Sequence, residues 1–409
     1  MNKRMDRSRL NIGAYILQPY ARTEAHIKDV ADCGIDFIVC MGNDKPALDL
    51  FHKYNVGAIV TGVLPGWWGG DGNNAGKLAE INPMEKYVAA AASFADHPAV
   101  WGIDVGDEPS ALDFPYYGRV IDYVNKAFPN QFAYLNLYPN YASVSQNNAE
   151  ETVNQLGTPT YEEHIRRYCE CIPSDYLCYD FYLYSINVTK HYENLRVVAD
   201  ACRDTGRSMW IVLQVNSNKP AEWMSENNLR FQAYTSMAFG AENIIWACYT
   251  AGWWHNQVLD AEGNKTPQYD KLKAVNSELR TMADEYMKYR RVATHFVGFE
   301  GHPHMAAVKQ AAIPSLSTGV FFDVKAEGDQ PLVVGEMVSR NADGSVALMI
   351  CAADDPYETD PKEYRITFKA YDRRLRAWSG KGYKVIEDLG DGKYAVAVKS
   401  NEGVLITAR

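Results

Sequence analysis

One unit recurs along most of this chain: a short run of β-forming residues, a loop rich in Gly, Pro or Asn, and an amphipathic helical stretch. The β-rich runs cover about 11–18, 35–41, 57–64, 100–109, 132–138, 176–184, 208–216 and 242–250. Helices are predicted over about 23–33, 46–54, 83–96, 114–128, 160–171, 191–205, 226–239 and 268–289. Eight such units in about 280 residues predict a (β/α)8 barrel.

An open, doubly wound α/β sheet is the alternative architecture. It predicts a Gly-rich phosphate-binding turn after the first strand. The turn found there, Gln18-Pro19-Tyr20-Ala21, contains no glycine, so the barrel is favoured.

The rhythm changes after about residue 290. Short alternating runs at 335–352, 364–371, 375–378, 383–388, 394–398 and 403–407 are separated by turns such as Asn341-Ala342-Asp343-Gly344. A chain of 409 residues also exceeds the size at which one core keeps growing. We therefore predict two domains: the barrel at 1–290 and an antiparallel β-sandwich at 291–409.

Charge and composition limit the partners. The net charge is -10, and no basic run offsets it, which argues against a nucleic acid or an anionic membrane. Aromatic residues make up 12% of the chain, with 9 Trp and 27 Tyr, enough for a ligand platform beyond a large core. Nothing in the sequence indicates an oligomeric state.

The cysteines and the N-terminus give further expectations. Most of the eight cysteines lie in apolar strand or helix patterns, as buried thiols do, and Cys169 and Cys171 form the only close pair. No second pair at zinc-like spacing follows, so neither a metal site nor a cofactor is expected. Residues 1–10 are polar and basic without an apolar signal region, so we expect a cytoplasmic protein, or an extracytoplasmic one whose signal peptide was removed.

The end of the fourth β run carries the clearest chemical signal. Val100-Trp101-Gly102-Ile103-Asp104-Val105-Gly106 leads to Asp107 and Glu108, and Pro109 stops the strand. A barrel keeps its chemistry at the C-terminal ends of its strands. Glu108 is thus a candidate general acid and Asp107 a neighbouring charge that raises its pKa, whereas Asp104 is expected to be structural. A helix-entry turn, where acids are also favoured, is the alternative.

Alternation places more polar and aromatic groups at other strand ends. The candidates that contact the substrate are Gln18, Asn136, Tyr138, Tyr182, Gln214 and Trp246, and the second carboxylate is Asp180. The pairs Trp67-Trp68 and Trp253-Trp254, each in a Gly-rich loop, are candidates to stack on sugar rings or to pack between domains. Cleavage of a glycosidic bond needs one protonated carboxyl and a second carboxylate, so this inventory predicts a carbohydrate substrate.

Several motifs resemble the β-galactosidase-like (clan A) glycoside hydrolase superfamily, and within it the bacterial glycosidase-like branch with Asp-Glu-Pro on the fourth strand. They are Trp101 to Pro109, Leu135-Asn136-Leu137-Tyr138-Pro139-Asn140-Tyr141, Gly157-Thr158-Pro159-Thr160-Tyr161, Tyr179-Asp180-Phe181-Tyr182 and Ala238-Phe239-Gly240-Ala241. The resemblance covers about residues 10 to 290 and implies that Glu108 occupies the acid/base position.

The sequence departs from the superfamily at two positions. Asp107 stands where the superfamily has an Asn that holds the sugar 2-hydroxyl, and Gln214 stands where it has a Glu nucleophile. Asp180 is the best replacement, and Glu222 and Glu226 are weaker candidates. Two other functions stay open: a carbohydrate-binding protein on a degenerate barrel, and a structural or partner-binding barrel.

Overall fold

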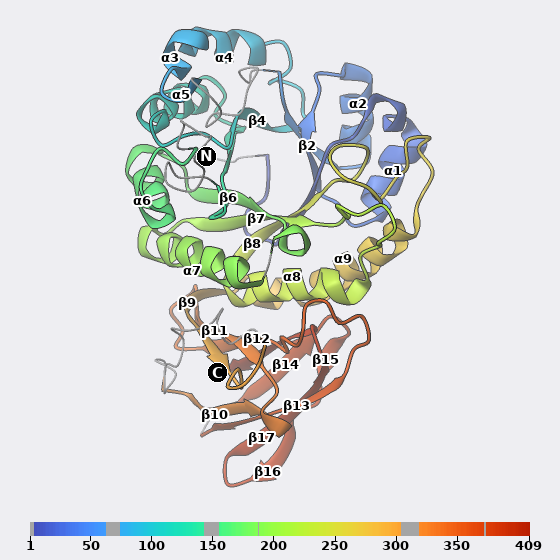
Figure 1. The fold of residues 1–409 in the computed structure, drawn as a ribbon, viewed down its shortest axis with the longest axis vertical. Helices are drawn as coiled ribbons and strands as arrows, with labels where there is room; N and C mark the ends of the chain where they lie inside the picture. Colours follow the sequence, from blue (N-terminus) through green and yellow to red (C-terminus); the bar gives the residue numbers. More distant parts are fainter. Residues whose placement is uncertain (1–3, 63–73, 143–154, 187, 304–318, 372–373) are drawn as a thin grey trace.

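The computed structural model describes residues 4–62, 74–142, 155–186, 188–303, 319–371 and 374–409. Eight parallel strands close into a barrel in the order β1 to β8, which confirms the predicted architecture (Figure 1). The strands are β1 (Asn11–Tyr15), β2 (Phe37–Met41), β3 (Gly57–Val60), β4 (Val100–Asp107), β5 (Phe132–Leu137), β6 (Tyr176–Phe181), β7 (Ser208–Gln214) and β8 (Ala241–Ala247).

Helices follow the strands on the outside of the barrel. They are α1 (Glu24–Asp32), α2 (Lys45–Lys53), α3 (Leu78–Ile81), α4 (Met84–Ala91), α5 (Phe114–Ala127), α6 (Tyr161–Cys171), α7 (Val188–Thr205), α8 (Glu226–Ala238) and α9 (Pro267–Tyr286). Side chains cap several of them: Thr23, Asp44, Thr160, Ser225 and Thr266 each accept a backbone N–H from the first turn. The predicted segments agree with these helices to within a few residues, except that α4 ends earlier and α3 was not foreseen.

The barrel has an inner and an outer core. Alternate strand residues such as Phe37, Tyr134, Tyr176 and Trp210 fill the interior. The residues between them pack outward against the helices, as Leu135 and Leu137 do on β5. The strand alternation read from the sequence therefore predicts side-chain direction correctly along β5 and β6.

The C-terminal domain consists of two antiparallel sheets around a separate core. One sheet has the order β15-β14-β18-β12-β11-β9 and the other β10-β13-β17-β16. The strands are β9 (Tyr289–Val297), β10 (Phe321–Ala326), β11 (Leu332–Ser339), β12 (Val346–Cys351), β13 (Glu363–Ala370), β14 (Leu375–Ser379), β15 (Gly382–Lys384), β16 (Glu387–Gly390), β17 (Lys393–Lys399) and β18 (Gly403–Ala408). The predicted sandwich is present, but β9 and β10 were not foreseen.

Helix α8 lies between the barrel and the six-stranded sheet (Figure 1). Nearly all of its residues from Asn227 to Ala238 are buried, because one side packs on the barrel and the other on β11, β12 and β18. A helix enclosed in this way needs no polar face. At its end, the Ala238 carbonyl approaches Gly335 of β11 so closely that a Cβ there would lie 2.1 Å from the oxygen.

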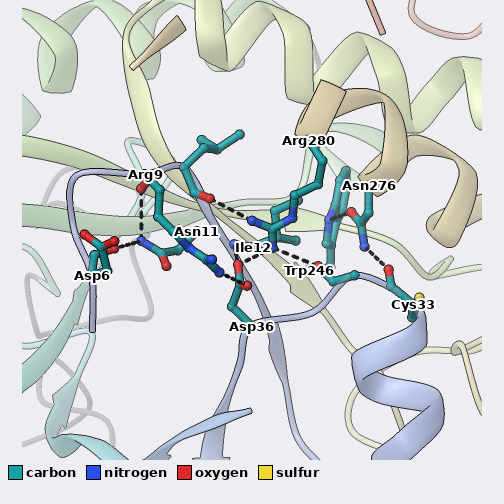
Figure 2. A network of polar contacts seen from close by, with 11 residues as sticks. Asp6, Arg9, Asn11, Ile12, Cys33, Asp36, Trp246, Asn276 and Arg280 are labelled. Atoms are coloured by element: carbon teal, nitrogen blue, oxygen red, sulfur yellow. Dashed lines mark hydrogen bonds and ion pairs between the residues drawn. The ribbon is translucent and has the colours of Figure 1, made fainter. Parts of the chain in front are cut away.

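A charged clamp joins β1, β2 and α9 at the N-terminal end of the strands (Figure 2). The Asp36 carboxylate accepts the backbone N–H of Ile12 at 2.8 Å and forms ion pairs with Arg9 and Arg280. Two guanidinium groups thus neutralise a carboxylate that is only 9% exposed.

Among the described residues, no helix combines the length and the apolar character needed to cross a membrane.

Gly335→Ala tests the packing between the domains. The added methyl group clashes with the α8 backbone, so we expect the free energy of unfolding to fall by about 1–3 kcal/mol. Gly42→Ala is the control, because its Cβ would make only ordinary contact, at 3.5 Å from Arg22. Equal stability of both variants in urea denaturation would contradict the observed approach.

Candidate active site

A β-bulge in β4 turns two acids toward the barrel axis. Asp104 pairs with Tyr134 of β5 and Asp107 with Asn136, so one extra residue of β4 lies between these pairs. The bulge turns Gly106 outward, where an added Cβ would meet Tyr117 and Leu135. Simple alternation would place Asp104 and Asp107 on opposite faces, whereas the bulge lets both side chains face inward.

Glu108 follows directly after β4. Its φ of +44° lies in the left-handed region, which is unusual for a residue with a side chain. Its backbone N–H donates to the Asn136 carbonyl at 2.9 Å, which continues the pairing with β5 past the strand end. The residue is half-buried. Such a strained conformation, held by neighbouring structure, is common at functional sites.

Asn136 links the carboxylates of two strands. Its Nδ2 donates to Asp107 Oδ1 at 3.2 Å and to Asp180 Oδ1 at 2.9 Å. Its Oδ1 accepts from the Cys178 thiol at 3.5 Å. The amide is thereby oriented with its nitrogen toward the two acids.

Burial raises the pKa of both acids. The pKa of Asp107 rises to about 6, although the hydrogen bond from Asn136 opposes the rise. Burial, and then the charge of Asp107, raise the pKa of Asp180 to about 7. Desolvation penalises the charged form, and a second carboxylate nearby adds repulsion. Both acids therefore hold their protons to a higher pH than exposed aspartates do.

Glu108 approaches Asp180 closely enough for a hydrogen bond between their side chains. Two carboxyl groups can share a hydrogen bond only if one of them carries a proton. This bond lowers the pKa of Asp180, against the effect of burial.

A layer of buried groups lies beneath these acids, deeper in the barrel. The Cys40 thiol donates to Asp104 at 3.7 Å. The hydroxyl groups of Tyr15 and Tyr134 are 2.7 Å apart, and Tyr134 contacts Cys178 at 3.3 Å. The sequence analysis did not assign Tyr15 or Cys40 to the site. Alternation alone identifies Tyr15 as inward, whereas Cys40 has a φ of +56° beside an irregularity in the pairing of β2 with β3.

Three half-buried aromatic residues lie beside the acids. Tyr182 contacts Trp253 edge-on, with ring centroids 5.9 Å apart, and Trp254 at 4.9 Å. Trp253 also contacts Tyr15 at 6.0 Å. The structure thus brings together Tyr182, Trp253 and Trp254, whereas Trp67 and Trp68 lie outside the described residues.

Gln214 is fully buried, and protein groups occupy its amide. Its Oε1 accepts from the Tyr184 N–H at 3.1 Å, and its Nε2 donates to Ser185 at 3.3 Å and to the Asn216 carbonyl at 3.0 Å. These bonds fasten the short helix η3 (Leu183–Ser185) to the end of β7. In this arrangement Gln214 positions a loop and has no group left for a sugar.

Trp246 points away from the barrel interior, contrary to the expected face shared with Cys248. Its Nε1 donates to Asn276 of α9 at 2.9 Å, and Asn276 donates to the Cys33 carbonyl (Figure 2). The expectation fails because β8 ends at Ala247, so the alternation does not continue to Cys248. Trp246 therefore fastens β8 to α9.

The other two candidates contact the protein itself. Tyr138 is buried in the outer core just after β5. Gln18 is half-buried, and its Nε2 donates to the Ala251 carbonyl at 2.6 Å, which joins the loops after β1 and β8.

Within the part of the chain that the structure describes, no group of three or more His, Cys, Asp or Glu is arranged to hold a metal ion.

The fold resembles that of carbohydrate-active enzymes. The chain matches a catalytic mutant of a GH42 β-galactosidase from G. stearothermophilus over 100% of both chains, at 8% identity and a TM-score of 0.56. The chain therefore shares with this enzyme the fold of a parallel barrel followed by a β domain. A cycloisomaltooligosaccharide glucanotransferase from Paenibacillus sp., complexed with cycloisomaltoheptaose, matches over 98% of this chain and 85% of its own, at 9% identity and a TM-score of 0.57. No protein-family model and no curated protein matches the sequence.

Asp180→Asn tests whether burial of this acid is costly. The folded protein holds a proton on Asp180 up to a pH of about 7, whereas the unfolded chain loses it near pH 4. Stability therefore falls as the pH rises between these values and stays low above them. We expect Asp180→Asn to be more stable than the wild type at pH 8 by at least ~1.4 kcal/mol, with the difference vanishing near pH 4.

Denaturant unfolding at both pH values measures this difference. Asp122→Asn, on the exposed surface of α5, is the control and is expected to show no gain at pH 8. A difference for Asp180→Asn that does not change with pH would contradict the raised pKa.

Proposed function

We propose that this protein is a glycosidase in which Glu108 is the general acid and Asp180 the second carboxylate. The observation that carries the proposal is the close approach of Glu108 and Asp180 at the C-terminal ends of β4 and β6. A general acid must be protonated near neutral pH, and two carboxyl groups this close can share one proton. We also propose that the protein belongs to the branch of the β-galactosidase-like superfamily that has Asp-Glu-Pro on the fourth strand, here Asp107-Glu108-Pro109.

In the proposed reaction, the glycosidic oxygen replaces Asp180 as the acceptor of the hydrogen bond from Glu108. Carboxyl groups in glycosidases are about 5–5.5 Å apart for retention and about 6.5–9.5 Å apart for inversion, so a hydrogen-bonded pair is closer than either mechanism requires. We infer that the glycosidic oxygen displaces Asp180 and takes the Glu108 proton as the bond to the anomeric carbon breaks. Asp180 is then a free carboxylate that either attacks that carbon or removes a proton from the attacking water.

Neighbouring residues support these two roles. Asn136 holds Asp180 and Asp107 at a fixed spacing, and Asp107 adds negative charge that favours a cationic transition state. Tyr182, Trp253 and Trp254 are the proposed contacts for the apolar faces of the sugar. Gln214 and Trp246, whose side chains bond to the protein itself, are not part of this proposal.

A sugar-binding protein without catalysis is the second candidate. It is favoured by Gln214, because the end of β7, where the superfamily resemblance places a nucleophile, carries a buried amide engaged by the protein. Binding of oligosaccharides in calorimetry without release of product from any member of a glycoside panel would identify this function.

Glu108→Gln tests the general acid on an aryl glycoside that the wild type cleaves. Since general acid catalysis contributes about 10²–10⁴-fold, we expect kcat/KM to fall by that factor for a phenol of high pKa. The loss is expected to be much smaller for a dinitrophenyl glycoside, whose leaving group needs no proton.

Glu222→Gln is the matched control, since this exposed acid follows β7 and pairs with Lys219. It is expected to keep wild-type kcat/KM on both substrates. Equal losses for both leaving groups in Glu108→Gln would show that Glu108 is not the proton donor. NMR of the first product anomer distinguishes retention from inversion.

A further inference from the structure

A cleft of about 680 Å³ lies at the opposite end of the barrel from the candidate active site. Its walls come from the segment before β1, from the starts of β7 and β8, from the end of α7, and from β9 of the C-terminal domain. Seven arginines line it, against three acids, Asp6, Asp175 and Glu242. The cleft is therefore strongly positive in a chain whose net charge is -10.

Some of these arginines have structural partners. Arg4 donates to backbone carbonyls that include that of Val100 at 2.9 Å. Arg7 forms an ion pair with Asp175, and Arg340 forms one with Glu242. These three arginines are held by the protein itself.

Arg291 on β9 is different because it is buried and only partly satisfied. Its side chain is 6% exposed. Its Nε donates to Thr294 at 2.6 Å and its Nη2 contacts Asp200 at 3.0 Å, but its Nη1 is buried without a hydrogen-bond partner. A buried, charged donor without a partner is costly and rare in native proteins, so it needs an explanation.

Further arginines near Arg291 add positive charge that acids offset only in part. Asp200, which pairs with Arg291, also pairs with Arg203 at 3.1 Å through the same oxygen. Arg207 donates to three backbone carbonyls, and no acid pairs with it among the described residues. Arg290 is exposed, and the described part of the chain offers it no ion pair.

We propose that this cleft binds a small phosphate-bearing molecule, with Arg291 as the central ligand and Arg207 and Arg290 around it. The planar guanidinium group matches the oxygens of a phosphate and provides strong, charge-assisted hydrogen bonds. The volume falls within the range of about 300–1,000 Å³ typical of small-molecule sites. Because the cleft has walls from both domains, a bound phosphate stabilises their association.

The test is binding of inorganic phosphate and of glucose 6-phosphate to the full-length protein, by calorimetry and thermal unfolding at constant ionic strength. We expect saturable binding and a higher Tm with phosphate but not with equivalent chloride. Tighter binding of the sugar phosphate would identify a phosphate monoester as the ligand, and equal affinity would identify free phosphate.

Two variants assign the site. Arg291→Gln is expected to abolish binding, and Arg290→Gln, at an exposed position, is expected to fold normally and to weaken it three- to tenfold. Arg119→Gln on the surface of α5 is the control and is expected to bind as the wild type does. Absence of saturable binding to the wild type, or unchanged affinity in Arg290→Gln and in folded Arg291→Gln, would overturn the proposal.

Discussion

Buried carboxylic acids without a neutralising cation are the constraint on which the candidate active site depends. Within the described residues, no basic side chain forms an ion pair with Asp104, Asp107 or Asp180. Burial of such groups disfavours their charged form, so protons are retained instead of cations being recruited. Amide and thiol donors from Asn136 and Cys40 satisfy individual oxygens without removing the negative charge. The result is a set of acids whose pKa values burial raises above those of exposed aspartates.

Asp36, at the opposite end of the barrel, is a buried acid with a structural role. Asp36 is also buried, but Arg9 and Arg280 neutralise it and the Ile12 N–H caps it. Removal of both arginines would leave an uncompensated buried charge, which is costly. Asp36, paired with arginines, stabilises the fold, whereas Asp180, which has no basic partner in the described part of the chain, has a raised pKa. This difference supports a catalytic role for Asp180 more strongly than the presence of a carboxylate alone.

The molecule is therefore electrically uneven along the barrel axis. Acids gather where the strands end, and arginines gather where they begin and where the C-terminal sheet packs against the barrel. Helix α8 lies between the two domains: β7 and β8 pack on one side of it, and β11 and β12 pack on the other. Gln232 of α8 exchanges two hydrogen bonds with the backbone of Gln214. The C-terminal domain thus packs against α8, and α8 in turn holds the end of β7.

The eightfold βα rhythm, the β domain after the barrel and the inward faces of β5 and β6 could be predicted from the sequence, because they depend on local periodicity and on turn residues. The same patterns place Glu108, Asp180 and Asn136 at strand ends. The remaining features depend on contacts between segments that are distant in the sequence. The bulge that turns Asp104 and Asp107 inward arises from the pairing with β5, and the end of β8 at Ala247 breaks the alternation between Trp246 and Cys248. Strand β9 forms by pairing with β11, and Gln214 is occupied by a loop distant in sequence. Side-chain alternation is a local property, whereas register and hydrogen-bond partners depend on residues that only the folded chain brings together.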